Sequence, residues 1–263
     1  MNTAVITVTP SLKASATLQE EAARWAASIG AAFVLRRRRS HETLQKEYDN
    51  LLVYTTQGPE ITTDRGRHRF HLNMAQLRLL HLQQGVPDHF LEALAATGPV
   101  RLLDCTCGFG ADAVIASYAL PAGSVVDALE ASPLLAAVTG WGFAHFNHDD
   151  LAVTKALRRI HLQQGDYENY LRDRTAQPYD ILYFDPMFSE PVESSCAFRP
   201  LRPLMDHQLL TPALIRLAAS KAARRIVIKG RRFDRLRRDF PGLRLVGGKY
   251  SRICYAVLES DSI

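Results

Sequence analysis

The sequence predicts an α/β fold with a doubly wound, mainly parallel sheet and a small α/β extension in front of it. Residues 100–130 carry the main evidence, because they read as a strand, a glycine loop, a helix and a second strand. Further strands are predicted at 160–164, 181–184 and 225–229. Two apolar runs on either side of Gly247-Gly248 then predict a closing antiparallel hairpin.

The extension is expected to span residues 1–97, and residues 98–263 are expected to form the main domain. The predicted elements of the extension are strands at 5–8, 32–35 and 51–54 and helices at 18–29, 74–84 and 86–96. Thr97-Gly98-Pro99 marks the boundary, because glycine and proline interrupt both helices and strands. The sequence contains no repeat and no low-complexity segment.

The main domain opens with a pattern that is typical of nucleotide-binding proteins. A strand at 100–104 leads through a glycine loop into a helix at 111–118. Gly108 and Gly110 allow a ligand to approach the backbone closely. Glu130, about 20 positions further along, can bind ribose hydroxyls. These residues predict a nucleotide-like ligand at the end of the first strand.

A dinucleotide-binding protein would show nearly the same pattern, since Gly108, Gly110 and Ala113 satisfy its looser glycine spacing. In such a protein the first glycine stands at the strand end, where the helix N-terminus faces a pyrophosphate. Here Asp104 ends the strand and the first glycine comes later in the loop. A carboxylate repels phosphate but suits the ammonium or sulfonium group of S-adenosylmethionine. The spacing therefore favours S-adenosylmethionine as the ligand.

Four carboxylates fall at the ends of four successive predicted strands, namely Asp104, Glu130, Asp166 and Asp185. In an open α/β sheet, this edge is where ligands bind. Asp166 can accept a hydrogen bond from an adenine amino group, with Tyr167 beside it. Each carboxylate alone also fits a helix N-cap or a solvated turn. Their shared position at strand ends favours a binding site.

The segment Asp185-Pro186-Met187-Phe188 follows the apolar run 181–184 and is the predicted catalytic loop. An exocyclic amine is a poor nucleophile, because its lone pair is delocalised into the neighbouring ring or carbonyl. The Asp185 carboxylate and the Pro186 carbonyl can accept both N–H groups and direct the lone pair at an electrophilic methyl group. Phe188 can stack on a flat substrate. The alternative is an ordinary Asp-Pro turn.

Positive charge is clustered along the chain, although the net charge is only +5. The clusters are Arg36, Arg37, Arg38 and Arg39, residues 65–69, and residues 221–238. Such clusters are the electrostatic footprint of a nucleic-acid binder. Arg199 and Arg202, in the long segment after the predicted catalytic loop, are expected to contact phosphate, and Lys229 is expected to face the substrate. The alternative for residues 221–238 is a solvated helix face. The alternative for the segment with Arg199 and Arg202 is that its prolines brace a crossover, and the alternative for Lys229 is a surface lysine.

Composition excludes several other classes of protein. Apolar residues make up 47% of the chain, which is enough for a full core, and no apolar run reaches the length of a membrane span. The N-terminus lacks a signal-peptide pattern. The four cysteines are too few and too irregularly spaced for a disulfide framework or a zinc site, so no metal is expected. These features favour a cytoplasmic protein.

The chain resembles the class I S-adenosylmethionine-dependent methyltransferases and, more narrowly, is similar to the small-subunit ribosomal RNA guanine-N2 methyltransferases. The resemblance rests on Asp-Cys-Thr-Cys-Gly-Phe-Gly-Ala-Asp at 104–112, Leu-Glu-Ala-Ser-Pro at 129–133, Tyr-Phe-Asp-Pro-Met-Phe at 183–188 and Ile-Val-Ile-Lys at 226–229. It implies a Rossmann-like, seven-stranded methyltransferase sheet, S-adenosyl-L-methionine as cofactor and ribosomal RNA as partner. The cofactor contacts that it implies are Ala111, Asp112, Glu130, Ala131, Asp166, Tyr167 and Asp185.

Several alternatives remain open from the sequence alone. The acceptor can be guanine N2, adenine N6, a glutamine amide or a small molecule. The rival from another class is a non-catalytic RNA-binding protein that keeps a cofactor pocket, although the intact loop at 185–188 argues against it. The extension can hold RNA or act as a structural cap. Either a monomer or a homodimer fits the sequence.

Overall fold

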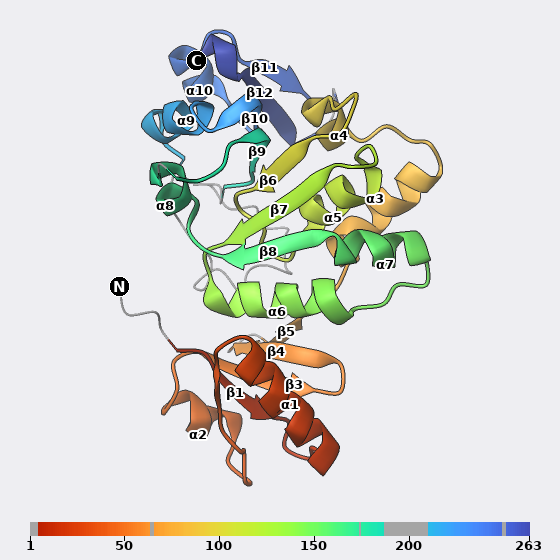
Figure 1. Cartoon of the computed structure of the whole chain (residues 1–263), viewed down its shortest axis with the longest axis vertical. Coiled ribbons are helices and arrows are strands. Elements are labelled where there is room, and N and C mark those ends of the chain that lie inside the picture. The colour runs from red at the N-terminus through yellow and green to blue at the C-terminus, as the bar shows by residue number, and fades with distance from the viewer. Residues whose placement is uncertain (1–4, 64–65, 174, 187–209, 249–250) are drawn as a thin grey trace.

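The computed structural model describes residues 5–63, 66–173, 175–186, 210–248 and 251–263. The chain forms two sheets, and helix α6 (Pro133–His145) lies between them (Figure 1). The predicted α/β class is confirmed. Within these described ranges, no helix is both long and apolar enough to pass through a lipid bilayer.

The smaller sheet has five strands in the order β2-β1-β3-β4-β5. The strands are β1 (Thr7–Pro10), β2 (Ala32–Phe33), β3 (Leu51–Thr55), β4 (Gly58–Thr63) and β5 (Gly66–Arg69). β1 pairs in parallel with β2 and β3, whereas β4 and β5 add antiparallel strands at one edge. Helices α1 (Ala16–Ser28) and α2 (His41–Gln45) complete this part, and the Ser15 side chain caps α1 by accepting the Leu18 N–H.

The larger sheet has seven strands in the order β11-β12-β10-β9-β6-β7-β8. The strands are β6 (Arg101–Asp104), β7 (Val125–Glu130), β8 (Ile160–Gln164), β9 (Tyr179–Phe184), β10 (Ala222–Gly230), β11 (Arg244–Val246) and β12 (Cys254–Glu259). Strands β6 to β10 run parallel, and β12 pairs antiparallel with both β10 and β11. The doubly wound sheet and its closing antiparallel hairpin are confirmed.

The order of the strands locates the ligand-binding edge. The chain moves outward from β6 to β7 and β8, and then crosses to β9 and β10 on the other side of β6. Ligands of open α/β sheets bind beyond the carboxyl ends of the strands at such a reversal. In this sheet the reversal lies between β6 and β9, so Asp104 and Asp185 stand on its two sides.

Helices pack on both faces of the larger sheet (Figure 1). One face carries α3 (Asn73–Gln83), α4 (His89–Leu94), α5 (Ala111–Ala119), α6 and α7 (Leu151–Arg158). The other carries α8 (Tyr167–Arg172), α9 (Pro212–Ala219), α10 (Asp234–Asp239) and the short 3₁₀ helix η2 (Ser260–Ser262). Strand side chains alternate between the two cores: Leu102 and Tyr183 join the first, whereas Leu103 and Phe184 join the second.

Helices α3 and α4 precede residue 98 in the sequence but pack against the larger sheet and its helices. α3 contacts α5, and α4 contacts β12, β11 and α5. They therefore bring side chains from the first 97 residues close to the larger sheet. The division of the chain at residue 97 stays a prediction.

The smaller sheet packs on α6 through a close contact. Phe70, just after β5, meets Phe143 edge to face with ring centroids 5.7 Å apart. A Cβ at Gly142 would lie 2.0 Å from Phe70 Cγ, so only glycine fits there. Beside it, Trp141 Nε1 donates a hydrogen bond to Tyr54 Oη at 3.4 Å. These contacts fix the smaller sheet against the larger domain.

Candidate active site

The glycine loop between β6 and α5 is tied to the neighbouring strand and left open beside Gly108. The Cys105 N–H donates to the Tyr183 carbonyl at 2.9 Å. Gly108 and Gly110 have φ angles of 56° and 78°, in the left-handed region that favours glycine. A Cβ at Gly108 would find no atom of the described residues within 4 Å. The loop therefore has the room that a closely approaching cofactor needs.

Glu130 ends β7 and holds the same loop from its other side. Its Oε2 accepts the Gly108 N–H at 2.7 Å, and its Oε1 accepts the Ser132 N–H at 2.8 Å. Thr139 of α6 donates from Oγ1 to the Gly108 carbonyl at 2.7 Å. Glu130 thus stands at the carboxyl end of β7 beside the glycine loop, where an acidic residue can bind ribose hydroxyls. The geometry of Glu130 fits the ribose-binding role expected of it.

Asp104 is the last residue of β6, and it is only 2% exposed. Burial raises the pKa of Asp104 well above its usual range, and the charges of Asp112 and Asp185 act in the same direction. A hydrogen bond from the Thr106 N–H, at 3.0 Å, opposes this rise. A cation bound beside Asp104 would lower its pKa and be attracted to the ionised form. The ammonium and sulfonium groups of S-adenosylmethionine fit this requirement.

Asp185 directly follows β9 and stands beside the glycine loop. Its N–H donates to Thr106 Oγ1 at 2.7 Å, and its Oδ2 accepts a hydrogen bond from Lys229 Nζ at 2.8 Å. Burial raises the pKa of Asp185, and the charge of Lys229 opposes this rise. The structure thus brings the first residue of the predicted catalytic loop next to the predicted cofactor loop.

Asp112, in the first turn of α5, is the centre of a buried group of charges. Its Oδ2 accepts hydrogen bonds from Lys229 Nζ at 2.9 Å and from Tyr183 Oη at 2.8 Å. Its Oδ1 pairs with Arg78 Nη1. Burial alone would raise the pKa of Asp112, but the charges of Lys229 and Arg78 outweigh burial and lower the pKa below its usual range. Asp112 is therefore ionised and bonded at both oxygens.

Sequence reasoning missed three residues that build this group of charges. Arg78 binds Asp88 through two N–H groups at 2.7 and 2.9 Å, and Asp88 caps α4 by accepting the Phe90 N–H at 2.9 Å. Asp88 carries only the signal of a helix start, and nothing in the local pattern marks Arg78. Tyr183 did carry a signal, because a tyrosine hydroxyl inside an apolar strand needs a buried partner.

Asp166 and Tyr167 lie just beyond the end of β8. Asp166 caps α8, because its Oδ1 accepts the Asn169 N–H at 2.9 Å. The Tyr167 ring is 4% exposed and packs edge to face on Phe184 with centroids 5.5 Å apart. Ala131, after β7, accepts a hydrogen bond from Gln164 Nε2 at 3.2 Å. These residues line the same sheet edge, and their contacts with the cofactor stay predictions.

Several residues of the predicted site lie outside the described part of the chain. They are Met187 and Phe188 of the predicted catalytic loop, and Arg199 and Arg202 of the following segment. Pro186 is the last residue described before this gap and is half-buried.

The four consecutive arginines form a turn in the smaller part of the protein. The strand before them ends at Phe33, so it is shorter than the predicted strand at 32–35. Arg37 and Arg38 have φ angles of 53° and 102°, and Arg36 Nε donates to the Arg39 carbonyl at 3.1 Å. The arginines therefore leave the sheet as a turn that is closed by one of their own side chains.

This arginine turn lies close to the second arginine cluster of the sequence. Partial burial lowers the pKa of Arg36, and the positive charge of Arg67 on β5 lowers it further. Arg39 is paired with Glu47 at 2.8 Å, whereas Arg37, Arg38 and Arg67 are exposed. The fold thus brings Arg36 of the first cluster near Arg67 of the second.

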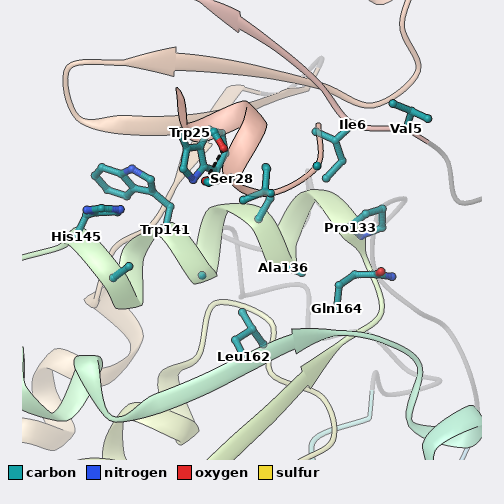
Figure 2. A pocket seen from close by; sticks show the side chains of 15 residues that line it. Val5, Ile6, Trp25, Ser28, Pro133, Ala136, Trp141, His145, Leu162 and Gln164 are labelled. Atoms are coloured by element: carbon teal, nitrogen blue, oxygen red, sulfur yellow. Dashed lines mark hydrogen bonds between the residues drawn. The ribbon is translucent and has the colours of Figure 1, made fainter. Parts of the chain in front are cut away.

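A cavity of about 720 Å³ lies between α1 and α6, apart from the predicted site (Figure 2). The rings of Trp25 and Trp141 stand along it, together with small side chains of α6 such as Ala136 (Figure 2). Its lining includes none of the four strand-end carboxylates. The cavity therefore belongs to the contact between the two parts of the protein, and the cofactor site must be located from the carboxylates.

Comparisons with known proteins identify a family that matches this chain and several similar proteins. The family described as "Putative SAM-dependent methyltransferase" matches residues 64–243. "Uncharacterized protein YpiP" of Bacillus subtilis is 33% identical over 181 residues, which are 68% of this chain and 70% of that protein. "Ribosomal RNA small subunit methyltransferase J" of Pseudomonas savastanoi pv. phaseolicola is 34% identical over 132 residues, which are 49% of this chain and 47% of that protein. The chain thus spans about half the length of this ribosomal RNA methyltransferase.

Solved structures with low similarity to this chain are also found. TrmN from Thermus thermophilus has 18% sequence identity and a TM-score of 0.46, covering 97% of this chain and 71% of its own. An O-methyltransferase from Bacillus cereus in complex with SAH has 15% identity and a TM-score of 0.41, covering 70% of this chain and 90% of its own. The predicted enzyme class and cofactor are confirmed by the family match: this chain belongs to the S-adenosylmethionine-dependent methyltransferases.

Proposed function

We propose that this enzyme methylates an exocyclic amine of RNA, and that guanine N2 of small-subunit ribosomal RNA is the acceptor. The position of Asp185 carries the proposal, because its N–H is bonded to Thr106 Oγ1 of the glycine loop at 2.7 Å. A carboxylate beside the cofactor loop is what transfer to an amine requires. Relatives named ribosomal RNA small subunit methyltransferase J, one of them 34% identical, support RNA as the acceptor. The cytoplasm is the matching compartment.

The proposed reaction is a direct in-line transfer at the end of β9. The bound cofactor supplies an electrophilic methyl group. Asp185 and the Pro186 carbonyl accept the two N–H groups of the amine, which takes its lone pair out of conjugation and fixes its direction. The negative charge of Asp185 stabilises the positive charge that develops on the nitrogen. Asp185 then takes the proton that the nitrogen releases.

The target base of the RNA must be unpaired to reach this site. The N2 amine of a paired guanine lies in the minor groove, so the base must be flipped out or lie in a loop. We propose that the arginine turn at 36–39 and Arg67 hold phosphates of the same RNA, because phosphate contacts supply much of the affinity of nucleic-acid binding. Arg199 and Arg202 are proposed to contribute further phosphate contacts. The part before residue 98 then serves to hold the substrate.

Labelled-methyl transfer tests this function. Protein, methyl-labelled S-adenosylmethionine and RNA from cells that lack the enzyme are expected to give labelled RNA. Digestion of that RNA should release labelled N2-methylguanosine. Naked small-subunit RNA, assembled subunits and total cell protein are offered as separate acceptors, so the preferred substrate is measured directly.

Each other outcome of this assay points to a named alternative. Label in N6-methyladenosine would move the acceptor to adenine, and label in protein alone would replace RNA by an amide acceptor. Cofactor binding and RNA binding without any transfer would favour the non-catalytic RNA-binding protein. Any of these results contradicts methylation of guanine N2.

A further inference from the structure

Five charged side chains form one continuous series of ion pairs behind the catalytic loop. In order they are Asp88, Arg78, Asp112, Lys229 and Asp185, hereafter the ion-pair series. They come from the segment before α4, from α3, α5 and β10, and from the end of β9. Their side chains are 12%, 23%, 8%, 18% and 29% exposed, respectively. Water therefore screens these charges only weakly.

Lys229 is the member of the ion-pair series that contacts Asp185, the first residue of the predicted catalytic loop. Its Nζ lies 2.8 Å from Asp185 Oδ2 and 2.9 Å from Asp112 Oδ2, so one ammonium joins α5 to the end of β9. Burial alone would lower the pKa of Lys229, but the charges of Asp112 and Asp185 outweigh burial and raise it above its usual range. Lys229 is therefore a permanent cation. A protonated lysine cannot serve as the base of the reaction.

Lys229 binds one oxygen of Asp185 and leaves the other for a substrate. Within the described part of the chain, Oδ2 of Asp185 bonds to Lys229 and Oδ1 makes no hydrogen bond. The Asp185 N–H is already bonded to Thr106 at 2.7 Å, so two contacts, one from the glycine loop and one from β10, fix this residue. A carboxylate held at one oxygen can present the second in a fixed direction. Such orientation is what a poor amine nucleophile needs.

We propose that Lys229 is a positioning residue for methyl transfer: it clamps Asp185 Oδ2 against Asp112 and so aims Oδ1 at the acceptor amine. The inference rests on the proposed catalytic role of Asp185. It assigns Lys229 a contact with the catalytic carboxylate in place of a contact with the substrate. Arg78 and Asp88 support the clamp by holding the Asp112 carboxylate from the side of α3.

The clamp makes the acid side of the pH–rate profile depend on the ion-pair series. The charged or titratable groups around Asp185 are Lys229, Asp112, Arg78, Asp104, Tyr183 and Tyr255. Lys229 lowers the pKa of Asp185, whereas burial and Asp112 raise it. Removing the lysine charge should therefore raise the pKa at which Asp185 becomes ionised. Removing the Asp112 charge should lower it.

The test compares kcat against pH for Lys229→Met, Lys229→Arg and Asp112→Asn, at saturating cofactor and RNA. In Lys229→Met the acid limb is expected to move about 1 to 3 pH units upward, the usual effect of losing one adjacent opposite charge. Asp112→Asn should move it downward, and Lys229→Arg should keep it near its original place. Lys155→Met, at an exposed position of α7, is the matched control and should change nothing.

A second readout does not depend on turnover. The carbon-13 carboxyl titration of Asp185, assigned with Asp185→Asn, should show the same shift of pKa in the free Lys229→Met protein. Loss of rate at every pH without movement of the acid limb or of this titration would overturn the positioning role. If Lys229→Met does not fold, the acid limb of Asp112→Asn tests the positioning role instead: a downward shift supports the role, and an unmoved limb overturns it. Full activity of Asp185→Asn would instead refute the proposed function. Failure of the positioning role and failure of the proposed function therefore give different results.

Discussion

Asp185→Ala is expected to lower kcat by at least about 10²-fold, the usual loss when a preorganised electrostatic group is removed from an active site. The variant loses the carboxylate that accepts the amine N–H and faces the developing positive charge. Lys229 keeps its ion pair with Asp112, at 2.9 Å, so the fold around the site should survive. Single-turnover methyl transfer at saturating cofactor measures the effect.

The control for this prediction is a carboxylate elsewhere on the surface. Asp149 lies in an exposed loop before α7, and Asp149→Ala should transfer methyl groups at the original rate. Affinity of Asp185→Ala for S-adenosylhomocysteine should remain within about tenfold, since Asp104 and Glu130 are untouched. An Asp185→Ala variant that retains more than a tenth of the original rate would show that the reaction takes place elsewhere.

Gly110→Ala is expected to cost about 2–5 kcal/mol of unfolding free energy, from left-handed backbone strain and overpacking together. Gly110 caps α5 at a φ of 78°, and an added Cβ would lie 2.3 Å from Cζ of Phe143. Phe143 is 3% exposed and also contacts Phe70, so its ring has little room to move. Urea unfolding of the cofactor-free protein, with an unchanged m-value, measures the loss.

Gly108→Ala is the matched control for this second prediction. Gly108 has a φ of 56°, but a Cβ there would meet no atom of the part of the chain that the structure describes within 4 Å. Only backbone strain remains, and this should cost about 1–2 kcal/mol. Equal losses in the two variants would mean that Phe143 yields easily and that the loop is not packed as described.

The sequence predicted the catalytic half of the fold because its signals there are local. Apolar runs of strand length, glycines at 108 and 110, and a carboxylate at each strand end occur within short windows. The structure then places Asp104 at the end of β6 and Asp185 directly after the neighbouring strand β9, as the strand-end pattern requires. A strand-end pattern is informative because parallel strands all end at the same edge of a sheet.

The rest could not be predicted, because it depends on contacts between distant segments. β4 begins with Gly58-Pro59-Glu60 and β5 is Gly66-Arg67-His68-Arg69, which lack the apolar alternation of an ordinary strand. They are strands because they pair with β3 and with each other. Arg78 meets Asp112 across 34 positions of sequence, so no spacing rule could join them.

The central claim is that the strand-end carboxylates build a cofactor site next to Asp185, and calorimetry with Asp104→Asn tests it most directly. The unaltered protein should bind S-adenosylmethionine and S-adenosylhomocysteine with micromolar affinity and should not bind NAD. Asp104→Asn should lose at least about tenfold of that affinity, since a charge-assisted contact contributes roughly 1.5–3 kcal/mol. Unchanged affinity in Asp104→Asn, or binding of NAD in place of S-adenosylmethionine, would contradict the claim.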